Sequence, residues 1–400
     1  MKRILAALCA AALFAGGTMA PLRAEEGAVK IGVLTDLSGF LSSSLGEGSI
    51  DGARMAIEDF GGEVLGQKIE LVSADHVNKP DVGLGIARKW YDEGVDVIAD
   101  IGNSAVGLGV QELAREKKKL VLFAGASSSA FTGKACSPYG TQWSHDTYMF
   151  SSVLPKRLTK AGDDTWFLVV ADFAFGHAMQ ADVTKAVEQA GGKVVGTVRH
   201  PPGTTDFSSF LFQAQGSGAK AVALMNAITD TTNSIKQWQE FQLGGQQKLI
   251  PLVLLVNDVK ALGLDAAQGV IFPTVFYWDL DDKTRAWAER FYKRNGFMPA
   301  EAHAGTYSAV LHYLKAVKAA GTKDPDKVSA MMKAMPVNDF YSDNVEIRED
   351  GRVMRKSYIA EAKSPAESKG PWDLYKILET VPAEESWRPL AESDCPLVKH

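Results

Sequence analysis

The chain has 400 residues and a formal net charge of −5. Its length exceeds what one hydrophobic core usually covers, so two lobes are expected. The negative charge, with no Lys/Arg block beyond Lys117–Lys119, argues against nucleic acid as a partner.

The first 24 residues have the pattern of a secretory signal peptide. Lys2 and Arg3 form a basic start, residues 4–14 form an apolar stretch, and cleavage is expected after Ala24. Cleavage after Ala20 is the alternative, although it would leave a proline at the new N-terminus. No later run reaches the roughly 18 apolar residues of a membrane-spanning helix. We therefore expect an exported, soluble protein.

Two cysteines, Cys136 and Cys395, remain after this processing. Because exported proteins usually oxidise such pairs, we predict a disulfide between them. The bond would hold the C-terminal tail against the rest of the fold. Two free thiols are the alternative, and export argues against it.

Short apolar runs alternate with helical patterns along the mature chain. Strands are predicted at Val29–Leu34, Ile69–Ala74, Val97–Ile101, Leu120–Phe123, Trp166–Ala171, Val194–Arg199, Ala221–Met225, Leu249–Leu255 and Val270–Thr274. Helices are predicted between them, and three more at roughly 283–295, 303–319 and 325–334. This alternation favours an α/β fold of two doubly wound open-sheet lobes.

The alternation pauses near residues 136–146, 275–282 and 345–355. We interpret the pauses as three crossings between the lobes, which together would form a three-segment hinge. The predicted domains are therefore lobe 1 (residues 28–146 and 279–352), lobe 2 (residues 147–278 and 353–385) and a tail (residues 386–400).

Two neighbouring strands end in turns of small polar residues. Val97–Ile101 leads into Gly102–Ala105, and Leu120–Phe123 leads into Gly125–Ser129. Such turns lie side by side at the carboxyl edge of a doubly wound sheet, where ligands bind. Their hydroxyl and free N–H groups suit a carboxylate, although helix capping is the alternative role. The predicted ligand contacts here are Asn103, Ser104, Ala105, Gly125, Ser127 and Ser128.

Further candidates follow strands of the second half. Phe175 could form an apolar ligand wall or belong to a core, and Asn226 could bond a ligand. Asp230 could balance an ammonium group or stabilise a helix N-terminus. Asn257 occupies a similar position.

Phe276, Tyr277 and Trp278 are three consecutive aromatic residues. They cannot all face one core in an extended chain, because side chains alternate. We therefore predict that Tyr277 or Trp278 faces the cleft between the lobes and stacks on a ligand.

Signatures of enzymes are weak. The sequence has no HExxH, P-loop or GxSxG motif, and Gly46–Gly52 resembles a dinucleotide loop whose last glycine falls one residue late. Its seven histidines are scattered, which indicates solvated or structurally satisfied side chains. We predict a binding protein that needs no cofactor or metal.

With these residues the chain resembles the leucine/isoleucine/valine-binding family, periplasmic receptors of ABC importers with the type I periplasmic binding protein fold. The resemblance runs from Val29 to at least Lys363 and includes Ile31–Gly39, Gly52–Asp59 and the two serine turns. It implies a ligand carboxylate on Ser104, a carbonyl and a hydroxyl from Gly125 and Ser127, and an aromatic contact from Phe175.

Residues 88–92, 111–119, 132–136 and 276–282 resemble a subgroup that carries aromatic carboxylates. Ser42–Leu45 departs from the family, which often has an aromatic residue there, and no acidic residue clearly matches the one that faces a ligand ammonium. Both departures argue against plain leucine binding.

The resemblance implies a monomeric periplasmic protein that captures an amino acid or aromatic acid by hinge closure and delivers it to a membrane permease. A sensory protein that presents its ligand to a chemoreceptor or kinase is the alternative. A secreted α/β enzyme is a more remote one.

Overall fold

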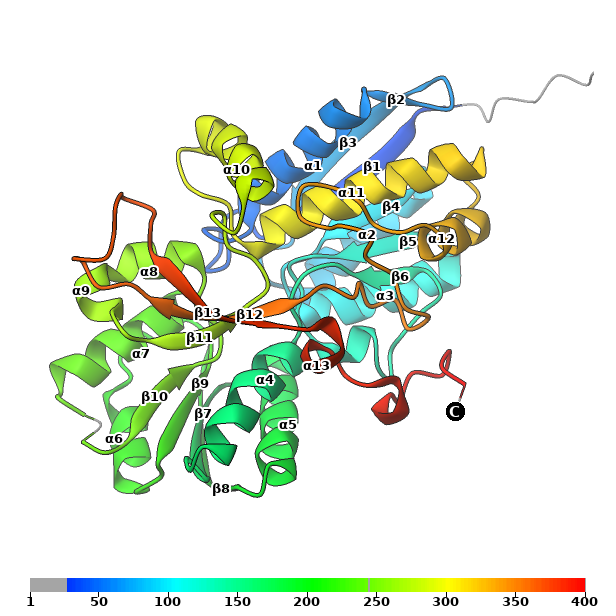
Figure 1. Cartoon of the computed structure of the whole chain (residues 1–400). Helices are drawn as coiled ribbons and strands as arrows, with labels where there is room; N and C mark the ends of the chain where they lie inside the picture. Colours follow the sequence, from blue (N-terminus) through cyan, green and yellow to red (C-terminus); the bar gives the residue numbers. More distant parts are fainter. Residues whose placement is uncertain (1–26, 244, 400) are drawn as a thin grey trace, which may run out of the picture.

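The structure, a computed structural model, describes residues 27–243 and 245–399. The predicted signal peptide, residues 1–24, lies outside the described residues. Two α/β lobes lie on either side of a narrow three-stranded sheet (Figure 1). The predicted fold class is confirmed.

The first lobe contains a six-stranded sheet in the order β2–β3–β1–β4–β5–β6. Its central strands pair in parallel, whereas β2 runs antiparallel to β3. The strands are β1 (Val29–Thr35), β2 (Glu63–Val64), β3 (Gln67–Asp75), β4 (Val97–Asp100), β5 (Leu120–Phe123) and β6 (Gly140–Gln142).

Helices from two distant segments cover this sheet. On one face α1 packs against α11, and their side chains share a core with the strands. On the other face α2 and α3 form a second core, so β4 and β5 are buried along their whole length. The helices of this lobe are α1 (Gly46–Phe60), α2 (Pro80–Asp92), α3 (Ser104–Lys117), α10 (Asp282–Asn295), α11 (Glu301–Ala320) and α12 (Pro325–Ala334).

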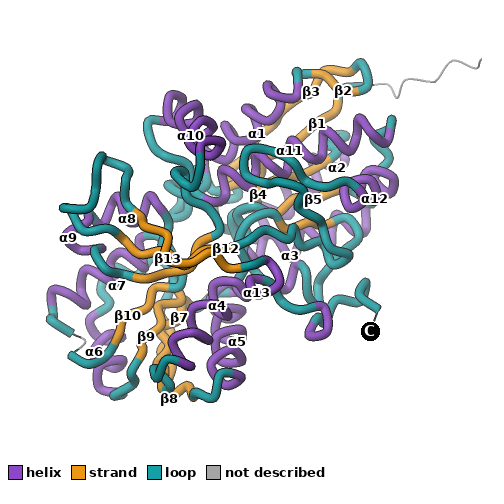
Figure 2. Tube along the Cα trace, viewed as in Figure 1, coloured by secondary structure: helices purple, strands orange, loops and turns teal. Residues whose placement is uncertain are grey.

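The second lobe contains a parallel sheet in the order β10–β9–β7–β8, again with helices on both sides (Figure 2). Its strands are β7 (Thr165–Ala171), β8 (Lys193–His200), β9 (Ala221–Met225) and β10 (Lys248–Pro251). Its helices are α4 (Thr147–Lys160), α5 (Ala174–Gln189), α6 (Ser208–Gly216), α7 (Thr229–Glu240), α8 (Val256–Leu262) and α9 (Leu264–Ala267).

Strand β10 ends at Pro251, four residues before the predicted end. The reason is its partner: β9 pairs with it only as far as Leu224, so the following residues have no strand beside them. Residues 252–255 instead turn toward the other lobe, where Val253 and Leu255 reach the cavity described below.

Between the lobes lies an antiparallel sheet of β11 (Ile271–Thr274), β12 (Ser357–Ala362) and β13 (Tyr375–Val381). Of these three strands the sequence analysis predicted β11 alone. The chain passes from lobe to lobe between β6 and α4, between β11 and α10, and before β12 (Figure 1).

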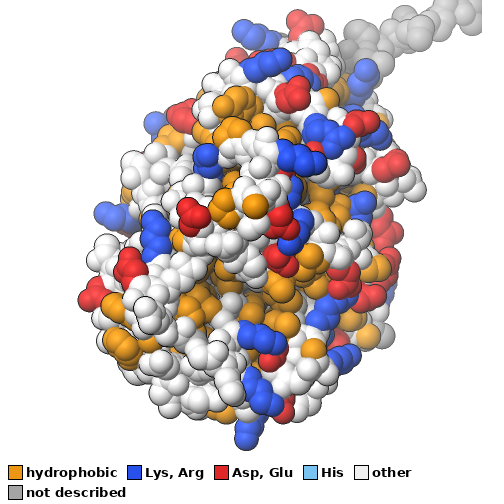
Figure 3. Space-filling view, turned by 60° about the vertical axis from the view of Figure 1, so that its left-hand side comes forward, with side chains coloured by type: hydrophobic (Ala, Val, Ile, Leu, Met, Phe, Trp, Pro, Cys, Tyr) orange, Lys and Arg blue, Asp and Glu red, His pale blue; other side chains and the backbone are white. Residues whose placement is uncertain are grey.

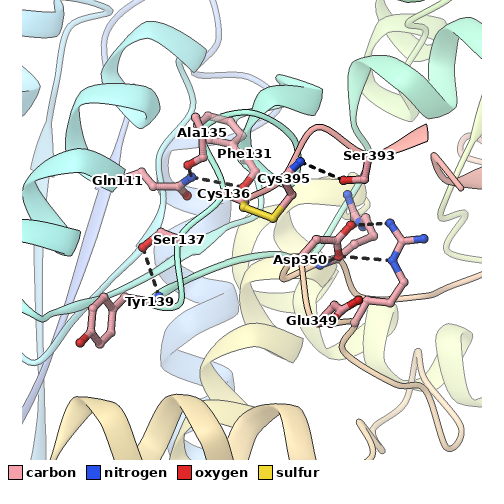
Figure 4. The surroundings of a disulfide bond; sticks show 12 residues. Gln111, Phe131, Ala135, Cys136, Ser137, Tyr139, Glu349, Asp350, Ser393 and Cys395 are labelled. Carbon is pink, nitrogen blue, oxygen red and sulfur yellow. Dashed lines mark hydrogen bonds and ion pairs between the residues drawn. A yellow bond between two sulfur atoms is a disulfide. The ribbon is translucent and has the colours of Figure 1, made fainter. Parts of the chain in front are cut away.

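After β13 the chain forms α13 (Ala383–Ser386), and the C-terminal tail that follows ends against the first lobe. The predicted disulfide is present: Cys136 bonds Cys395, with their Cα atoms 5.6 Å apart (Figure 4). Val398 packs beside the two sulfur atoms. The bond joins the tail to the segment that precedes β6.

Charged side chains of both signs are interspersed on the face shown in Figure 3. Partly exposed ion pairs occur in the described chain, such as Arg290 with Asp59 and Arg294 with Glu58. Within the described part of the chain, no helix combines the length and hydropathy that crossing a bilayer requires.

Candidate ligand-binding site

A cavity of about 50 Å³ lies between the lobes, where the carboxyl ends of the two parallel sheets face each other. Turns after β1, β4, β5 and β6, with Ala302 of α11, form one wall, and turns after β7, β9 and β10 form the other. This is the expected place for a ligand in doubly wound folds. Its small size suits a compact molecule.

Ser104 contributes a hydroxyl to the first wall. It is the first residue of α3, and its side chain is buried. Asn103 takes the capping role: its Oδ1 accepts from the N–H groups of Ala105 (2.8 Å) and Val106 (3.2 Å). The Ser104 hydroxyl and N–H group have no protein partner within the described residues, so both are free to bind a ligand.

The second serine turn adds Gly125 and Ser127 to the same wall. The Ser127 hydroxyl donates to the Gly125 carbonyl at 3.1 Å, and its N–H group has no partner among the described residues. Ser128 lies outside the lining, where its Oγ accepts from the N–H of Ala130.

Gly125 is needed for close packing at this wall. A Cβ atom built on it would lie 2.8 Å from Asp100 Oδ1 and 2.9 Å from a methyl carbon of Leu45. Any side chain would therefore displace its neighbours, so only glycine lets the turn sit this close to the β4 turn.

His145 also lines this wall, although the sequence analysis treated the histidines as structural. Its Nδ1 bonds Glu301 Oε2, and its ring packs on Phe150 with centroids 4.7 Å apart. The sequence signal was weak because the preceding strand, β6, has only three residues. The segment therefore looked like a simple crossing.

Apolar side chains complete the cavity. Phe173 and Phe175 lie side by side with ring centroids 5.6 Å apart, and Phe175 is in the position that the sequence predicted. The other apolar contributors, which were not singled out from the sequence, are Leu41, Leu45, Ala227, Ile228, Val253, Leu255 and Ala302.

Three predicted residues of the second lobe lie outside the cavity lining. Asn226 is fully buried and bonds Thr231 and Ser234, so its amide is satisfied by protein. Asp230 accepts from the N–H of Gly203, and burial raises its pKa to about 6. Asn257 donates from its side-chain amide to the backbone carbonyl of Ser43 in the other lobe.

Tyr277 and Trp278 also lie elsewhere. Both donate to the backbone carbonyl of Trp372, at 3.0 and 2.9 Å, and Tyr277 stacks on Tyr375. Phe276 points instead into the core of the first lobe. Two different cores therefore accommodate the alternating aromatic side chains, and none of the three forms part of the cavity wall.

Among the residues that the structure describes, no cluster of three His, Cys, Asp or Glu side chains is arranged to hold a metal ion. The cavity wall therefore offers hydroxyl groups, backbone N–H groups and one imidazole at one end. Apolar side chains surround the rest. Such a wall can hold a small molecule that has one polar end.

A family model described as "Periplasmic binding protein" matches residues 28–370. The chain is 42% identical to a periplasmic binding protein from Burkholderia mallei, covering 93% of this chain and 99% of that chain with a TM-score of 0.90. It is 41% identical to a branched chain amino acid ABC transporter periplasmic ligand-binding protein from Burkholderia xenovorans, covering 93% and 100% with a TM-score of 0.83.

A more distant structure, an ABC transporter solute-binding protein from R. palustris in complex with benzoate, is 20% identical. It covers 93% of this chain and 100% of that chain, with a TM-score of 0.81. At this identity the likeness shows the fold alone.

Proposed function

This chain belongs to the periplasmic binding protein family of transporter solute-binding proteins, which are not enzymes, and we propose that it captures a small monocarboxylate for an ABC importer. The observation that carries the proposal is the polarity of the inter-lobe cavity. Its polar groups gather on the first lobe, whereas the second lobe contributes apolar side chains.

The carboxylate would bind to Ser104 and Ser127. Both residues line the cavity, and the N–H group of each is without a protein partner in the described chain. The Ser104 hydroxyl is likewise unpartnered there, whereas the Ser127 hydroxyl donates to the Gly125 carbonyl, so Ser127 would contribute its N–H group. Ser104 also begins a 14-residue helix, whose N-terminal dipole favours an anion. Together these groups can make several charge-assisted hydrogen bonds.

The rest of the ligand would be aromatic or branched aliphatic. Phe173 and Phe175 offer flat apolar surfaces, and leucine, isoleucine and valine side chains surround them. No Asp or Glu side chain is among the residues that line the cavity, so an ammonium group would lack a counter-charge there. We therefore favour an aromatic acid over an amino acid. The benzoate complex of the R. palustris protein is consistent with this choice.

Capture would occur by hinge closure. Because both lobes contribute to the cavity wall, a ligand makes all its contacts only when the lobes are together, and it therefore favours that form. The protein would act as a monomer in the periplasm after export and would hand the ligand to the membrane permease.

A thermal-shift and calorimetry panel of benzoate, 4-hydroxybenzoate, L-leucine and benzamide tests the proposal. We expect benzoate or 4-hydroxybenzoate to raise Tm with rising concentration, more than L-leucine does. Benzamide, which has the same ring without the charge, should bind much more weakly. The proposal fails if no carboxylate raises Tm, and the preference for an aromatic acid fails if L-leucine binds most tightly.

A further inference from the structure

His145 is the one titratable side chain in the cavity lining. It follows β6, the third of three adjacent parallel strands whose turns form the polar wall. The turns after β4 and β5 carry Ser104 and Ser127, so the imidazole extends the row of polar groups by one turn. The ring is buried, with 6% of its surface exposed.

Glu301 determines which ring nitrogen is available. This buried carboxylate accepts from the backbone N–H of Val275 (2.9 Å) and from the Thr274 hydroxyl through one oxygen. Its other oxygen bonds His145 Nδ1. Since a carboxylate with these partners acts only as an acceptor, Nδ1 carries a proton. Nε2 has no protein partner within the described residues, so it is the nitrogen left for a ligand.

Resting on the proposed function, we propose that His145 binds the ligand carboxylate as an imidazolium, donating its Nε2–H while Glu301 holds Nδ1. The imidazolium would supply the positive charge of a site that otherwise offers only hydroxyl and N–H groups. Glu301 does not touch the ligand and is a positioning residue.

Charges of both signs lie around the ring, since the buried guanidinium groups of Arg352 and Arg355 donate to the backbone carbonyls of Ser144 and Trp143. Glu301 faces Nδ1, and the Ser144 hydroxyl lies 3.3 Å from the same nitrogen. Asp100, behind Gly125, also interacts with the ring electrostatically, and burial raises the pKa of Asp100 to about 6. With Glu301 and Asp100 nearby, a positive charge on the imidazole is compensated in the protein interior.

Two variants distinguish the role of Nδ1 from that of Nε2. In His145→Asn the side-chain amide can still reach Glu301, but the Nε2 donor is removed. In His145→Gln the amide reaches the Nε2 position as an uncharged donor. His177→Asn, at an exposed histidine paired with Asp172, is the matched control.

The measured quantity is the ratio of benzoate to benzamide affinity, with L-leucine and L-leucinamide substituted if the panel favours leucine. We expect this ratio to fall at least tenfold in His145→Asn, less in His145→Gln, and not in His177→Asn. The Tm of each ligand-free variant reports whether it is folded. In Glu301→Gln the ratio should also fall, because the imidazolium loses its counter-charge.

Spectra of ¹⁵N-histidine-labelled wild-type protein provide a second readout, and folded His145→Asn assigns the signal. With saturating benzoate, one ring should show two protonated nitrogens, and this signal should be missing in His145→Asn. A deprotonated Nε2 in the complex, or an unchanged affinity ratio in folded His145→Asn, would overturn the inference while leaving the proposed function intact. If the wild type binds no carboxylate, the proposed function itself fails.

Discussion

Asn257 donates a hydrogen bond from its side-chain amide to the backbone carbonyl of Ser43, at 2.8 Å. The two residues belong to different lobes, since Ser43 precedes α1 and Asn257 lies in α8. Phe40 and Phe173 make a second contact between the lobes, edge to face with ring centroids 6.5 Å apart. Asn257, which was predicted as a ligand contact, therefore bonds the opposite lobe.

Replacing Asn257 with Ala should weaken ligand binding without touching the cavity. Loss of one hydrogen bond of about 1 kcal/mol would raise Kd roughly fivefold, because the bond is made only when the lobes are together. Calorimetry measures the affinity, and small-angle scattering of the ligand-free variant should show a larger radius of gyration. Asn233→Ala is the control, since that amide bonds Thr204 within one lobe. Equal effects of the two variants would contradict this role.

Ser104→Ala should lower affinity for the bound monocarboxylate by about 10- to 100-fold, the usual value of a hydrogen bond to a charged group. The hydroxyl has no partner within the described chain, so the Tm of the ligand-free protein should barely change. Ser128→Ala is a close control from the neighbouring turn, because that hydroxyl lies outside the cavity lining. A Ser104→Ala protein that binds as tightly as the wild type would exclude the proposed carboxylate position.

Asp258 should make the protein less stable as pH rises. Burial raises its pKa to about 7, with a contribution from the charge of Glu301, against an ordinary value of 3.8. The favourable neutral form is present at low pH and is lost as pH rises through about 7. We therefore expect Asp258→Asn to gain stability relative to the wild type between pH 5 and pH 8, by up to a few kcal/mol. Urea denaturation at the two pH values measures this gain.

Asp206→Asn serves as the control for that experiment. Hydrogen bonds from Ser208 lower the pKa of Asp206, so its contribution to stability is complete above pH 4 and lost only in stronger acid. Its effect should be the same at pH 5 and pH 8. A stability difference for Asp258→Asn that is likewise independent of pH would contradict the prediction.

Reduction of the disulfide should destabilise the protein. The bond closes a loop of 259 residues, and loss of a native disulfide typically costs about 2–5 kcal/mol. Melting curves with and without a phosphine reductant measure the effect. The double variant Cys136→Ser, Cys395→Ser should melt at the lower temperature under both conditions. A wild type whose Tm is insensitive to complete reduction would contradict the prediction.

Much of the fold could be predicted from the sequence because parallel strands covered on both faces are nearly continuous apolar runs. Leu120–Phe123 and Ala221–Met225 agree residue for residue with β5 and β9. The antiparallel strands β12 and β13 were missed. In β13 buried and partly exposed residues are mixed, so no apolar run marks the strand.

Among the candidate residues named from the sequence, several at the turns that follow strand ends line the cavity, whereas the positions set by distant hydrogen-bond partners could not be anticipated. Ser104 and Ser127 lie at the short turns that follow the apolar strands β4 and β5, which places them at the carboxyl edge. The position of Asn226, in contrast, is decided by the hydroxyls of Thr231 and Ser234, which satisfy its amide. His145 bonds Glu301, which lies 156 residues away in the sequence. A local sequence pattern cannot predict a hydrogen bond between residues so far apart.

The tail that follows β13 touches both halves of the molecule. Its covalent attachment at Cys395 is to the first lobe, whereas Arg388 and Glu392 form ion pairs with Asp182 and Lys185 of α5 in the second. If the lobes separate, the disulfide remains intact because it is covalent. The ion pairs between the tail and α5 would therefore have to break. The Lys185–Glu392 pair is partly exposed and therefore sensitive to salt, so the angle between the separated lobes would depend on ionic strength.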